Sequence, residues 1–360
     1  MPDKTIMIMA GGTGGHVYPA LAVADYLKQQ GFNLLWLGTE RGLEYRVVPE
    51  RGYTLLTISV AGVRGKGLLR TLVSPFMLAF ALIQALLIMI RLRPAAVLGM
   101  GGFASGPGGV AAWMMRIPLL IHEQNAIAGL TNKLLVPFAR KVMAAFPGAF
   151  EQMDKLIISG NPVRDEISSI LPPEQRLAGR SGETLNVLVL GGSLGALKLN
   201  EQLPAALAAV DQCRLNIRHQ CGEAHQQLTE QKYEVLGIHA EVMPYIDNMA
   251  EQYSWADIVI CRAGALTIAE LAATGVGSIL VPYPHAVDDH QTANARYLEQ
   301  GDAAVIIQQP DLNAERIKQV LGGLCQSYQR CIDMASKARA LAKPDATRLV
   351  AENCMEAAHA

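Results

Sequence analysis

The chain has 360 residues, of which 51% are hydrophobic and 18% are charged, and its formal net charge at pH 7 is −1. This length predicts two domains, each large enough to bury a core of its own. The near-zero charge provides no basic field and argues against binding of nucleic acid. The 6 cysteines lack CxxC pairs and zinc spacing, and no signal peptide is recognisable, so we expect reduced thiols in a cytosolic protein.

The first half of the chain alternates strand and helix patterns. We expect strands at 5–9, 33–37, 95–100, 119–121 and 141–145, and a helix at 19–30 with Pro19 near its start. This alternation predicts a doubly wound parallel sheet. Such sheets bind ligands beyond the carboxyl ends of their strands, which makes His16, Glu123 and Asn125 candidates to converge on one crevice.

Residues 72–90 form an uncharged apolar segment that is long enough to span a membrane as a helix. Three interpretations stay open: an interfacial or partly exposed helix, a buried core helix, and a true span. Pro75 and Gln84 interrupt the segment, and basic residues flank it on both sides, which suits contact with anionic headgroups better than spanning. The flanking basic residues are Arg64, Lys66, Arg70, Arg91 and Arg93.

The alternating pattern breaks at 159–164, where Gly160, Asn161 and Pro162 predict a turn, and a polar stretch follows to 183. A strand at 185–190, a glycine turn at 191–196 and a helix at 198–210 then repeat the opening pattern of the chain. This repeat predicts two similar α/β domains. We place them at 1–163 and 164–340, and expect residues 341–360 to form a helix that packs back on the first domain.

The most informative stretch is 257–277, where a strand at 258–260 ends in a turn at 262–265 and a helix follows. The unpaired N–H groups and the dipole at the start of that helix suit a diphosphate. Glu270 lies about 9 Å further along the helix, close to the distance between the phosphates and the ribose of a nucleotide. The alternative is an ordinary strand–helix turn with a surface glutamate.

Three other functions fit parts of the chain less well. Residues 12–17 match the dinucleotide fingerprint GxGxxG except at Val17, and the acidic residue expected after the second strand is missing. Residues 191–195 match the GxSxG elbow of hydrolases, and Asp288 or Asp289 with His290 could complete a triad. However, an Asp and a His directly adjacent in sequence rarely orient one another, and no HGGG-type oxyanion segment is present. A further alternative is a metal site formed by His285, Asp288, Asp289 and His290.

Seven motifs occur together and in a fixed order. They are GGTGGH at 11–16, GGFASGP at 101–107, HEQNA at 122–126, GNPVR at 160–164, GGSLGA at 191–196, CRAGALTIAE at 261–270 and PHAVDDHQTANA at 284–295. With this set the chain closely resembles, over essentially its whole length, the bacterial UDP-GlcNAc transferases that convert lipid I to lipid II in peptidoglycan synthesis (the MurG family). The resemblance implies a GT-B fold, in which two Rossmann-like domains face one another across a cleft.

The resemblance also implies a UDP-GlcNAc site. Ile246 would contact uracil through its backbone, Glu270 would hold the ribose, and Arg164 would meet the phosphates. Gln291 would bind the sugar, although the loop around it varies in length within the family. Residues expected around the diphosphate are Ser193, Ala265, Leu266, Thr267, Ile268 and Ala269. Residues expected to close over the donor sugar are Thr13, Gly14, Gly15 and Asn125.

The chemistry implied is an inverting displacement in which the C4 hydroxyl of the muramic sugar attacks the anomeric carbon of GlcNAc and UDP leaves. His16 is the first candidate for the base that takes the hydroxyl proton and Glu123 is the second. The start of the helix at 265 and Arg164 would stabilise the departing UDP, without an essential metal or cofactor.

The lipid-linked acceptor implies a peripheral protein on the cytoplasmic face of the membrane, near anionic lipids. Expected membrane contacts are Phe76, Leu78, Phe80 and Leu82, together with Trp113. Other proteins of cell-wall synthesis and division are expected partners. Two alternatives remain: a GT-B transferase that acts on another lipid such as diacylglycerol, and a catalytically inactive GT-B scaffold. The complete set of donor-loop motifs argues against the scaffold.

Overall fold

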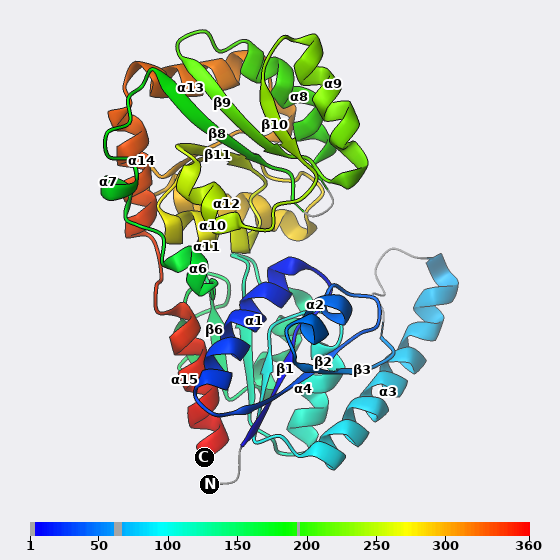
Figure 1. Ribbon diagram of the computed structural model, residues 1–360. Coiled ribbons are helices and arrows are strands. Elements are labelled where there is room, and N and C mark those ends of the chain that lie inside the picture. Colours follow the sequence, from blue (N-terminus) through cyan, green and yellow to red (C-terminus); the bar gives the residue numbers. More distant parts are fainter. Residues whose placement is uncertain (1–3, 61–66, 193–194) are drawn as a thin grey trace. The chain divides into compact units, whose positions relative to one another are not determined.

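The computed structural model describes residues 4–60, 67–192 and 195–360, with no description of the side chains of residues 67–73. The chain divides into two compact units (Figure 1). Unit 1 comprises Met1–Arg164 and Pro344–Ala360, and unit 2 comprises Asp165–Lys343. Each unit is built around one parallel sheet, so the predicted pair of Rossmann-like α/β domains is confirmed.

Unit 1 contains a 7-stranded sheet in the order β3-β2-β1-β4-β5-β6-β7. All described neighbours in it are parallel, as the alternation of strands and helices predicted. The strands are β1 (Thr5–Met9), β2 (Asn33–Gly38), β3 (Thr54–Thr57), β4 (Ala96–Gly99), β5 (Leu119–Glu123), β6 (Lys141–Ala144) and β7 (Leu156–Ile158). The sequence pattern missed β3 and β7, which are short and only partly buried.

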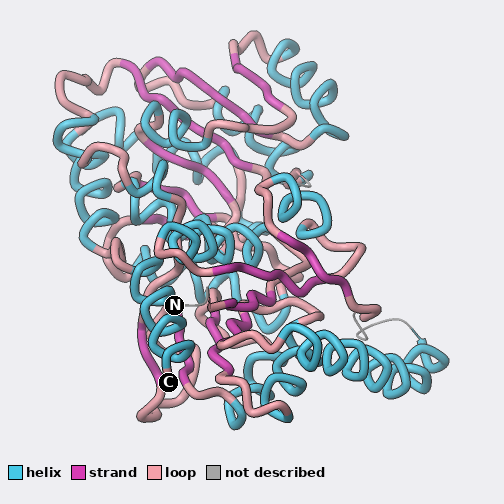
Figure 2. The backbone as a smooth tube through the Cα atoms, turned by 60° about the horizontal axis from the view of Figure 1, so that its bottom comes forward, coloured by secondary structure: helices cyan, strands magenta, loops and turns pink. Residues whose placement is uncertain are grey.

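Helices cover both faces of this sheet, as the cyan and magenta segments of Figure 2 show. Ile6 and Ile8 of β1 pack with α1 and α15, whereas Met7 and Met9 point to the opposite face and pack with α3 and α4. The helices of unit 1 are α1 (Gly14–Gln29), α2 (Glu44–Glu50), α3 (Gly67–Leu92), α4 (Ser105–Met114), α5 (Leu130–Leu135) and α15 (Ala346–His359), with a short 3-10 turn at Val136–Phe138.

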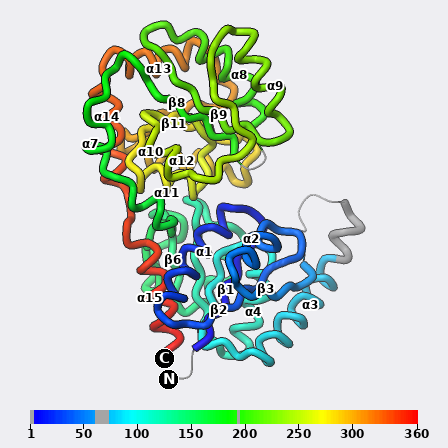
Figure 3. Tube along the Cα trace, in the orientation of Figure 1, coloured from blue at the N-terminus to red at the C-terminus, as the bar shows by residue number. Residues whose placement is uncertain are grey.

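The C-terminal helix α15 lies against α1, where the red end of the tube runs beside the blue α1 segment in Figure 3. Val350, Ala351 and Cys354 bury one side of α15 in the core that they share with α1. At the far end of the helix, Nζ of Lys4 donates a hydrogen bond to the carbonyl of Ala358 at 2.8 Å. The last segment of the chain thereby completes the core of unit 1.

The helix α1 begins at Gly14, five residues earlier than the predicted start at 19. The carbonyl of Thr13 accepts hydrogen bonds from the backbone N–H groups of His16 and Val17, at 3.1 and 3.2 Å. The glycine-rich loop therefore forms the first helical turn itself, and Pro19 lies inside the helix. His16 consequently projects from that first turn.

The long helix α3 is amphipathic in the described part of its length. Ala81, Ala85 and Met89 are fully buried against the sheet, at the four-residue spacing of one helix face. Residues Ser74–Leu92 are apolar and long enough to cross a membrane by length and composition, but only 17% of the segment's most apolar window is buried. The alternative of a fully buried core helix is therefore wrong.

Unit 2 contains a 6-stranded sheet in the order β10-β9-β8-β11-β12-β13, again parallel between all described neighbours. Leu185, Val187 and Val189 of β8 pack against α8 and α13 on one face. The strands are β8 (Thr184–Leu190), β9 (Arg214–Gln220), β10 (Ala240–Met243), β11 (Ile258–Cys261), β12 (Gly277–Leu280) and β13 (Ala304–Ile306).

The described helices of unit 2 are α6 (Asp165–Ser168), α7 (Pro173–Arg176), α8 (Leu197–Ala208), α9 (Gln226–Val235), α10 (Met249–Trp255), α11 (Ala265–Thr274), α12 (His290–Glu299), α13 (Ala314–Gln326) and α14 (Gln329–Ala340). Short 3-10 turns lie at Glu223–His225, Val287–Asp289 and Gln309–Asp311.

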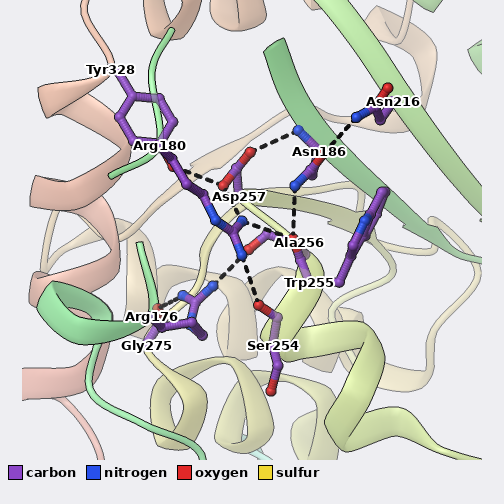
Figure 4. A network of polar contacts seen from close by, with 10 residues as sticks. All are labelled: Arg176, Arg180, Asn186, Asn216, Ser254, Trp255, Ala256, Asp257, Gly275 and Tyr328. Atoms are coloured by element: carbon purple, nitrogen blue, oxygen red, sulfur yellow. Dashed lines mark hydrogen bonds and ion pairs between the residues drawn. The ribbon is translucent and has the colours of Figure 1, made fainter. Parts of the chain in front are cut away.

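A buried ionic network ties the start of unit 2 to the amino ends of its central strands (Figure 4). The carboxylate of Asp257 accepts hydrogen bonds from Arg180 at 2.6 Å, from the hydroxyl of Tyr328 at 2.8 Å and from the backbone N–H of Asn186 at 2.8 Å. Arg176 donates to the carbonyls of Ala256 and Gly275, both at 2.7 Å, and burial lowers the pKa of its guanidinium to about 10. The segment after the unit boundary is thereby fixed to the sheet.

The expectation of six reduced cysteines is wrong for one pair. Cys213 and Cys325 form a disulfide, with their Cα atoms 5.6 Å apart. The two cysteines are separated by 112 residues in the sequence, and they meet because α13 packs against α8 at the start of β9. The spacing of the cysteines in the sequence does not reveal this proximity. The remaining cysteines, Cys221, Cys261, Cys331 and Cys354, are free thiols and buried.

Candidate active site

The loop after β1 orients His16 through a backbone carbonyl. The ring nitrogen Nδ1 of His16 lies 3.2 Å from the carbonyl oxygen of Gly11. A carbonyl oxygen can only accept, so this hydrogen bond places a proton on Nδ1 and leaves the lone pair of the neutral ring on Nε2. Gly101, with φ of +95°, packs against the same ring, because a Cβ at that position would lie 2.9 Å from Nε2. Thr13 is exposed, and Gly14 and Gly15 form the first turn of α1.

Glu44 supports this loop and was not identified from the sequence, where it lies beyond a polar loop. Its carboxylate is fully buried and accepts hydrogen bonds from the backbone N–H of Gly12 at 2.8 Å and from the backbone and hydroxyl of Thr39 at 3.0 and 2.8 Å. A Cβ at Gly11 or Gly42 would lie within 2.4 Å of this carboxylate group. Gly11 of the GGTGGH motif and Gly42 outside it are thus required to admit Glu44, and the spacing of residues in the sequence does not reveal this.

Glu123, the second candidate base, lies at the end of β5 with only 2% of its surface exposed. Oε1 accepts from the backbone and side-chain nitrogens of Asn125 at 3.0 and 3.2 Å. Oε2 accepts from the backbone of Gly129 at 3.0 Å and from the side chain of Asn132 at 2.8 Å. Both carboxylate oxygens therefore hold the loop that presents Asn125.

His122 is a structural histidine that links β5 to the end of unit 1. Nε2 donates to the carbonyl of Gly160 at 3.0 Å, and Nδ1 accepts from Nε2 of Gln124 at 3.1 Å. Complete burial lowers the pKa of His122 to about 4, so the ring is neutral at physiological pH. Nearby, the guanidinium of Arg164 lies 5.6 Å from the ring centroid of Tyr18 on α1. Arg164 is thereby brought to the turn that carries His16.

In unit 2, β11 feeds directly into α11, as the sequence predicted. Gly264 precedes the helix and has no side chain to cap it, so the backbone N–H groups of the first turn point outward. The N–H of Ile268 is already bonded to the carbonyl of Gly264 at 2.9 Å, and the Ile268 side chain is fully buried. An anion at this helix start would therefore meet the N–H groups of Ala265, Leu266 and Thr267, while Ile268 and Ala269 lie within the helix.

Glu270 lies further along α11, and only 5% of its surface is exposed. Its Oε2 accepts a hydrogen bond from the hydroxyl of Tyr253 at 3.0 Å. Tyr253 is fully buried on α10 and was not identified from the sequence. The alternative of a surface glutamate is wrong, because this carboxylate is buried and held in place.

Gln220 joins the two loops expected to hold uracil and phosphate. Its side chain accepts from the N–H of Gly192 at 2.9 Å and donates to the carbonyls of Gly192 and Pro244 at 3.1 and 3.0 Å. Ile246 follows this second loop with a buried side chain, which leaves only its backbone to meet a base. Ser193 lies outside the described residues.

The loop after β12 is fixed by neighbours that the sequence did not single out. Arg262 donates to the carbonyls of Val281 and Pro282 at 3.1 and 3.2 Å, and buried Asn294 donates to the carbonyl of Ala263 at 3.1 Å. Gln291 accepts from the N–H of Tyr283 at 2.9 Å through its side-chain oxygen. Its side-chain nitrogen is the hydrogen-bond donor of the group that is expected to bind the sugar.

The structure does not bring the four residues of the alternative metal site together as ligands. His290 donates from Nδ1 to the carbonyl of Val287 at 2.7 Å, and Asp289 accepts from the hydroxyl of Thr292 at 2.8 Å, so both shape the start of α12. Within residues 4–60, 67–192 and 195–360, no group of three His, Cys, Asp or Glu side chains is placed to hold a metal ion.

The predicted membrane residues divide between two sides of α3. Phe76, Leu78 and Phe80 are exposed, whereas Leu82 is half-buried against the core of unit 1. Ile83, Leu87 and Ile90 continue the exposed apolar face, and Trp113 and Met114 are exposed on the adjacent α4. Arg91 and Arg93 are described and exposed. Arg64 and Lys66 lie outside the described residues, as does the side chain of Arg70.

Comparison with known proteins agrees with this architecture. Residues 6–144 match the glycosyltransferase family 28 N-terminal domain, and residues 186–350 match the corresponding C-terminal domain. The chain is 52% identical over 359 residues to the UDP-N-acetylglucosamine–N-acetylmuramyl-(pentapeptide) pyrophosphoryl-undecaprenol N-acetylglucosamine transferase of Marinobacter nauticus, covering 99% of both chains. It is also 52% identical over 354 residues to the protein of the same name from Alkalilimnicola ehrlichii, covering 98% of this chain and 99% of that one.

A crystal structure of Acinetobacter baumannii MurG superposes with a TM-score of 0.85 at 43% sequence identity, covering 98% of this chain and 99% of that chain. The two family-28 domains, the full-length identity and this structural match agree with one another. The chain therefore belongs to glycosyltransferase family 28 and, within it, to the MurG family of UDP-N-acetylglucosamine–N-acetylmuramyl-(pentapeptide) pyrophosphoryl-undecaprenol N-acetylglucosamine transferases, with a GT-B fold.

Proposed function

We propose that this chain transfers GlcNAc from UDP-GlcNAc to the C4 hydroxyl of the MurNAc of lipid I, giving lipid II and UDP in peptidoglycan synthesis. The observation that carries this proposal is an identity of about half of all residues, over nearly the whole chain, to enzymes named for that transfer. Each of these relatives is named for an N-acetylmuramyl acceptor, which favours lipid I over diacylglycerol.

On the donor side, we assign the diphosphate to the start of α11 and the ribose to Glu270. The N–H groups of Ala265, Leu266 and Thr267 stabilise the charge that develops on UDP as it leaves. Tyr253 holds the Glu270 carboxylate in place for the ribose diol. Further contacts in this assignment are Ser193, Ile246 and Gln291 from unit 2, and Thr13, Gly14, Gly15, Asn125 and Arg164 from unit 1.

On the acceptor side, we assign proton removal to His16. Nε2 takes the proton of the C4 hydroxyl while the oxygen forms its bond to the anomeric carbon of GlcNAc. The bond from that carbon to the phosphate oxygen breaks on the opposite face, its electron pair leaves with UDP, and the configuration inverts. The hydrogen bond from Nδ1 to the Gly11 carbonyl favours this role, because it presents Nε2 as the basic nitrogen.

Glu123 fits a positioning role better than that of the base. Its two oxygens accept four hydrogen bonds from the loop after β5 and from Asn132 on α5, and the side chain is buried. Protonating this carboxylate would break at least one of those hydrogen bonds within a buried site. We therefore assign Glu123 to holding Asn125 rather than to proton transfer.

We further propose that unit 1 rests on the cytoplasmic face of the membrane through the exposed face of α3. Phe76, Phe80, Ile83, Leu87 and Ile90 recur at helical spacing on this face, and the basic residues at the carboxyl end of α3 suit anionic headgroups. An interfacial helix of this kind would bring the enzyme to an acceptor whose polyprenyl chain stays in the bilayer. In this proposal the protein also binds other proteins of cell-wall synthesis and division.

The function is tested by following transfer from radiolabelled UDP-GlcNAc to a short-chain lipid I analogue, with diacylglycerol as the competing acceptor and EDTA in a parallel reaction. We expect label to be transferred to lipid I and not to diacylglycerol. The yield of labelled disaccharide product is expected to be the same with and without EDTA. Transfer to diacylglycerol alone would overturn the acceptor assignment. Loss of transfer in EDTA that Mg²⁺ restores would overturn the metal-free mechanism.

A further inference from the structure

A single peptide group connects the buried carboxylate of Glu44 to the imidazole of His16. The N–H of Gly12 donates to Oε2 of Glu44 at 2.8 Å. The carbonyl of the same peptide group, that of Gly11, accepts from Nδ1 of His16 at 3.2 Å. The carboxylate, the peptide and the imidazole thus form one continuous chain of hydrogen bonds.

The connecting peptide is held on both sides. A Cβ at Gly102 would lie 2.6 Å from the carbonyl oxygen of Gly11, so the loop after β4 packs directly on this peptide group. On the other side, Thr39 holds Oε1 of Glu44 through its backbone N–H at 3.0 Å and its hydroxyl at 2.8 Å. Glu44 is fully buried, so water does not screen its charge.

We propose that Glu44 is a positioning residue that fixes the tautomer of His16 and raises its proton affinity through the Gly11–Gly12 peptide. A carboxylate that accepts from the N–H of a peptide polarises that peptide, and its carbonyl becomes a stronger acceptor. The stronger acceptor stabilises the imidazolium that forms when Nε2 takes a proton. The arrangement performs the task of the aspartate in a Ser-His-Asp triad, with one peptide group inserted between carboxylate and histidine.

This inference rests on the proposed role of His16 as the base. Other ionisable groups at this end of the sheet are Tyr18 and Arg164, which lie against one another, and Glu123 at the end of β5. The positive charge of Arg164 opposes protonation of His16, whereas a buried negative charge at Glu44 favours it. Glu123 is occupied by its own four hydrogen bonds. Among these groups, Glu44 is the one that reaches His16 through a hydrogen-bonded peptide.

The first test compares the Glu44→Gln enzyme with the wild type and with the Glu40→Gln control, a neighbouring glutamate that is exposed. Glutamine keeps the size of the side chain but removes the charge. We expect kcat for transfer to fall by about tenfold, with KM for UDP-GlcNAc within about twofold. We expect the acid limb of the kcat/KM profile to move to lower pH by about half a unit or more, because the imidazole becomes less basic.

A displaced loop would lower activity without moving the acid limb, so the pH profile separates the proposed role from a merely structural one. An acid limb of Glu44→Gln that coincides with that of the wild type would overturn the proposal. Glu44→Asp restores the charge on a shorter side chain, and recovery of the wild-type acid limb in this variant would further support it.

A second measurement uses wild-type protein and needs no activity. NMR of protein labelled with ¹⁵N in its histidines reports which ring nitrogen of His16 carries the proton, with His16→Ala to assign the signals. The proposal requires the Nδ1–H tautomer at neutral pH, and the Nε2–H tautomer would contradict it. If His16→Ala retained full activity while the tautomer was Nδ1–H, the assignment of the base would fail and the hydrogen-bonded relay would stand.

Discussion

The hydroxyl of Tyr253 donates a hydrogen bond to Oε2 of Glu270 at 3.0 Å, and both side chains are buried in unit 2. Tyr253 lies on α10 and Glu270 on α11, the helices that precede and follow β11 in the sequence. This contact holds in place the carboxylate that we propose binds the ribose diol. A ribose site at Glu270 therefore depends on a tyrosine that makes no proposed contact with the nucleotide.

Tyr253→Phe is expected to raise KM for UDP-GlcNAc about fivefold and to change kcat little. Loss of one hydrogen bond is equivalent to about 1 kcal/mol, and here it acts on the orientation of Glu270 rather than on the reacting atoms. Steady-state kinetics at saturating acceptor measure both constants. Tyr26→Phe, a half-buried tyrosine of unit 1, is the control, and a fall in kcat without a change in KM would contradict the assignment.

Asp257→Asn is expected to lower the free energy of unfolding by about 2 kcal/mol. The substitution removes the charge that pairs with Arg180 and disturbs the hydrogen bonds from Tyr328 and Asn186 in a buried setting. Chemical denaturation measures the effect. The control is Asp211→Asn, because the ion pair of Asp211 with Lys318 is largely exposed and contributes little. Equal effects of the two substitutions would contradict the role of the buried network.

Stability is expected to fall as the pH is lowered from about 6.5 to 4. Burial lowers the pKa of His122 to about 4 and that of His219 to about 3, whereas a histidine in the unfolded chain keeps its ordinary pKa of 6.5. Between these values the unfolded chain binds more protons than the folded one, so the free energy of unfolding decreases as the pH falls. Each histidine contributes up to about 3 kcal/mol to this loss.

Thermal melting as a function of pH measures this dependence. Replacing His122 by Gln is expected to lower stability at pH 7 and to flatten the dependence below pH 6.5, because one of the two titrating groups is gone. His239→Asn removes an exposed histidine and is expected to leave the slope unchanged. A slope in His122→Gln as steep as that of the wild type would contradict the assignment.

Replacing Phe76, Phe80 and Leu87 by serine is expected to weaken binding to vesicles that contain anionic lipid by on the order of a hundredfold. These exposed side chains lie on one face of α3, and each would lose the transfer free energy of an apolar side chain. Flotation with liposomes measures the bound fraction. The control is Leu228→Ser with Val235→Ser, an exposed apolar pair on α9 of unit 2. A bound fraction unchanged by the α3 substitutions would contradict the assignment of this face of α3 to membrane binding.

The sequence predicted the elements that have a strong local pattern. The strand at 5–9 matches β1, and the strand, turn and helix from 258 onward match β11 and α11, because short apolar runs and glycine turns are local signals. The start of α1 was misplaced because the glycine-rich sequence at 11–15 is typical of a loop. In the structure the helix begins at Gly14, and the N–H groups of His16 and Val17 donate to the carbonyl of Thr13.

The supporting residues of the site were not predictable from local patterns. Glu44 belongs to none of the seven motifs, and its burial depends on Gly11, Gly38 and Gly42 meeting around it in the folded chain. Tyr253 and Gln220 likewise act across elements that only the sheet topology brings together. The residues that we propose contact substrate carry motif signals, whereas the residues that hold them in place do not.

The proposed mechanism is tested most directly by the effect of His16→Ala on turnover and on donor affinity, measured on the same protein. Single-turnover transfer to the lipid I analogue gives the rate of the chemical step, and calorimetric titration with UDP-GlcNAc gives the affinity. His239→Ala, at an exposed site, is the control. We expect the rate to fall by about 10²- to 10⁴-fold with donor affinity unchanged within about twofold, as loss of a general base requires. Equal losses in rate and affinity, or a rate close to that of the wild type, would contradict the assignment of His16 as the base.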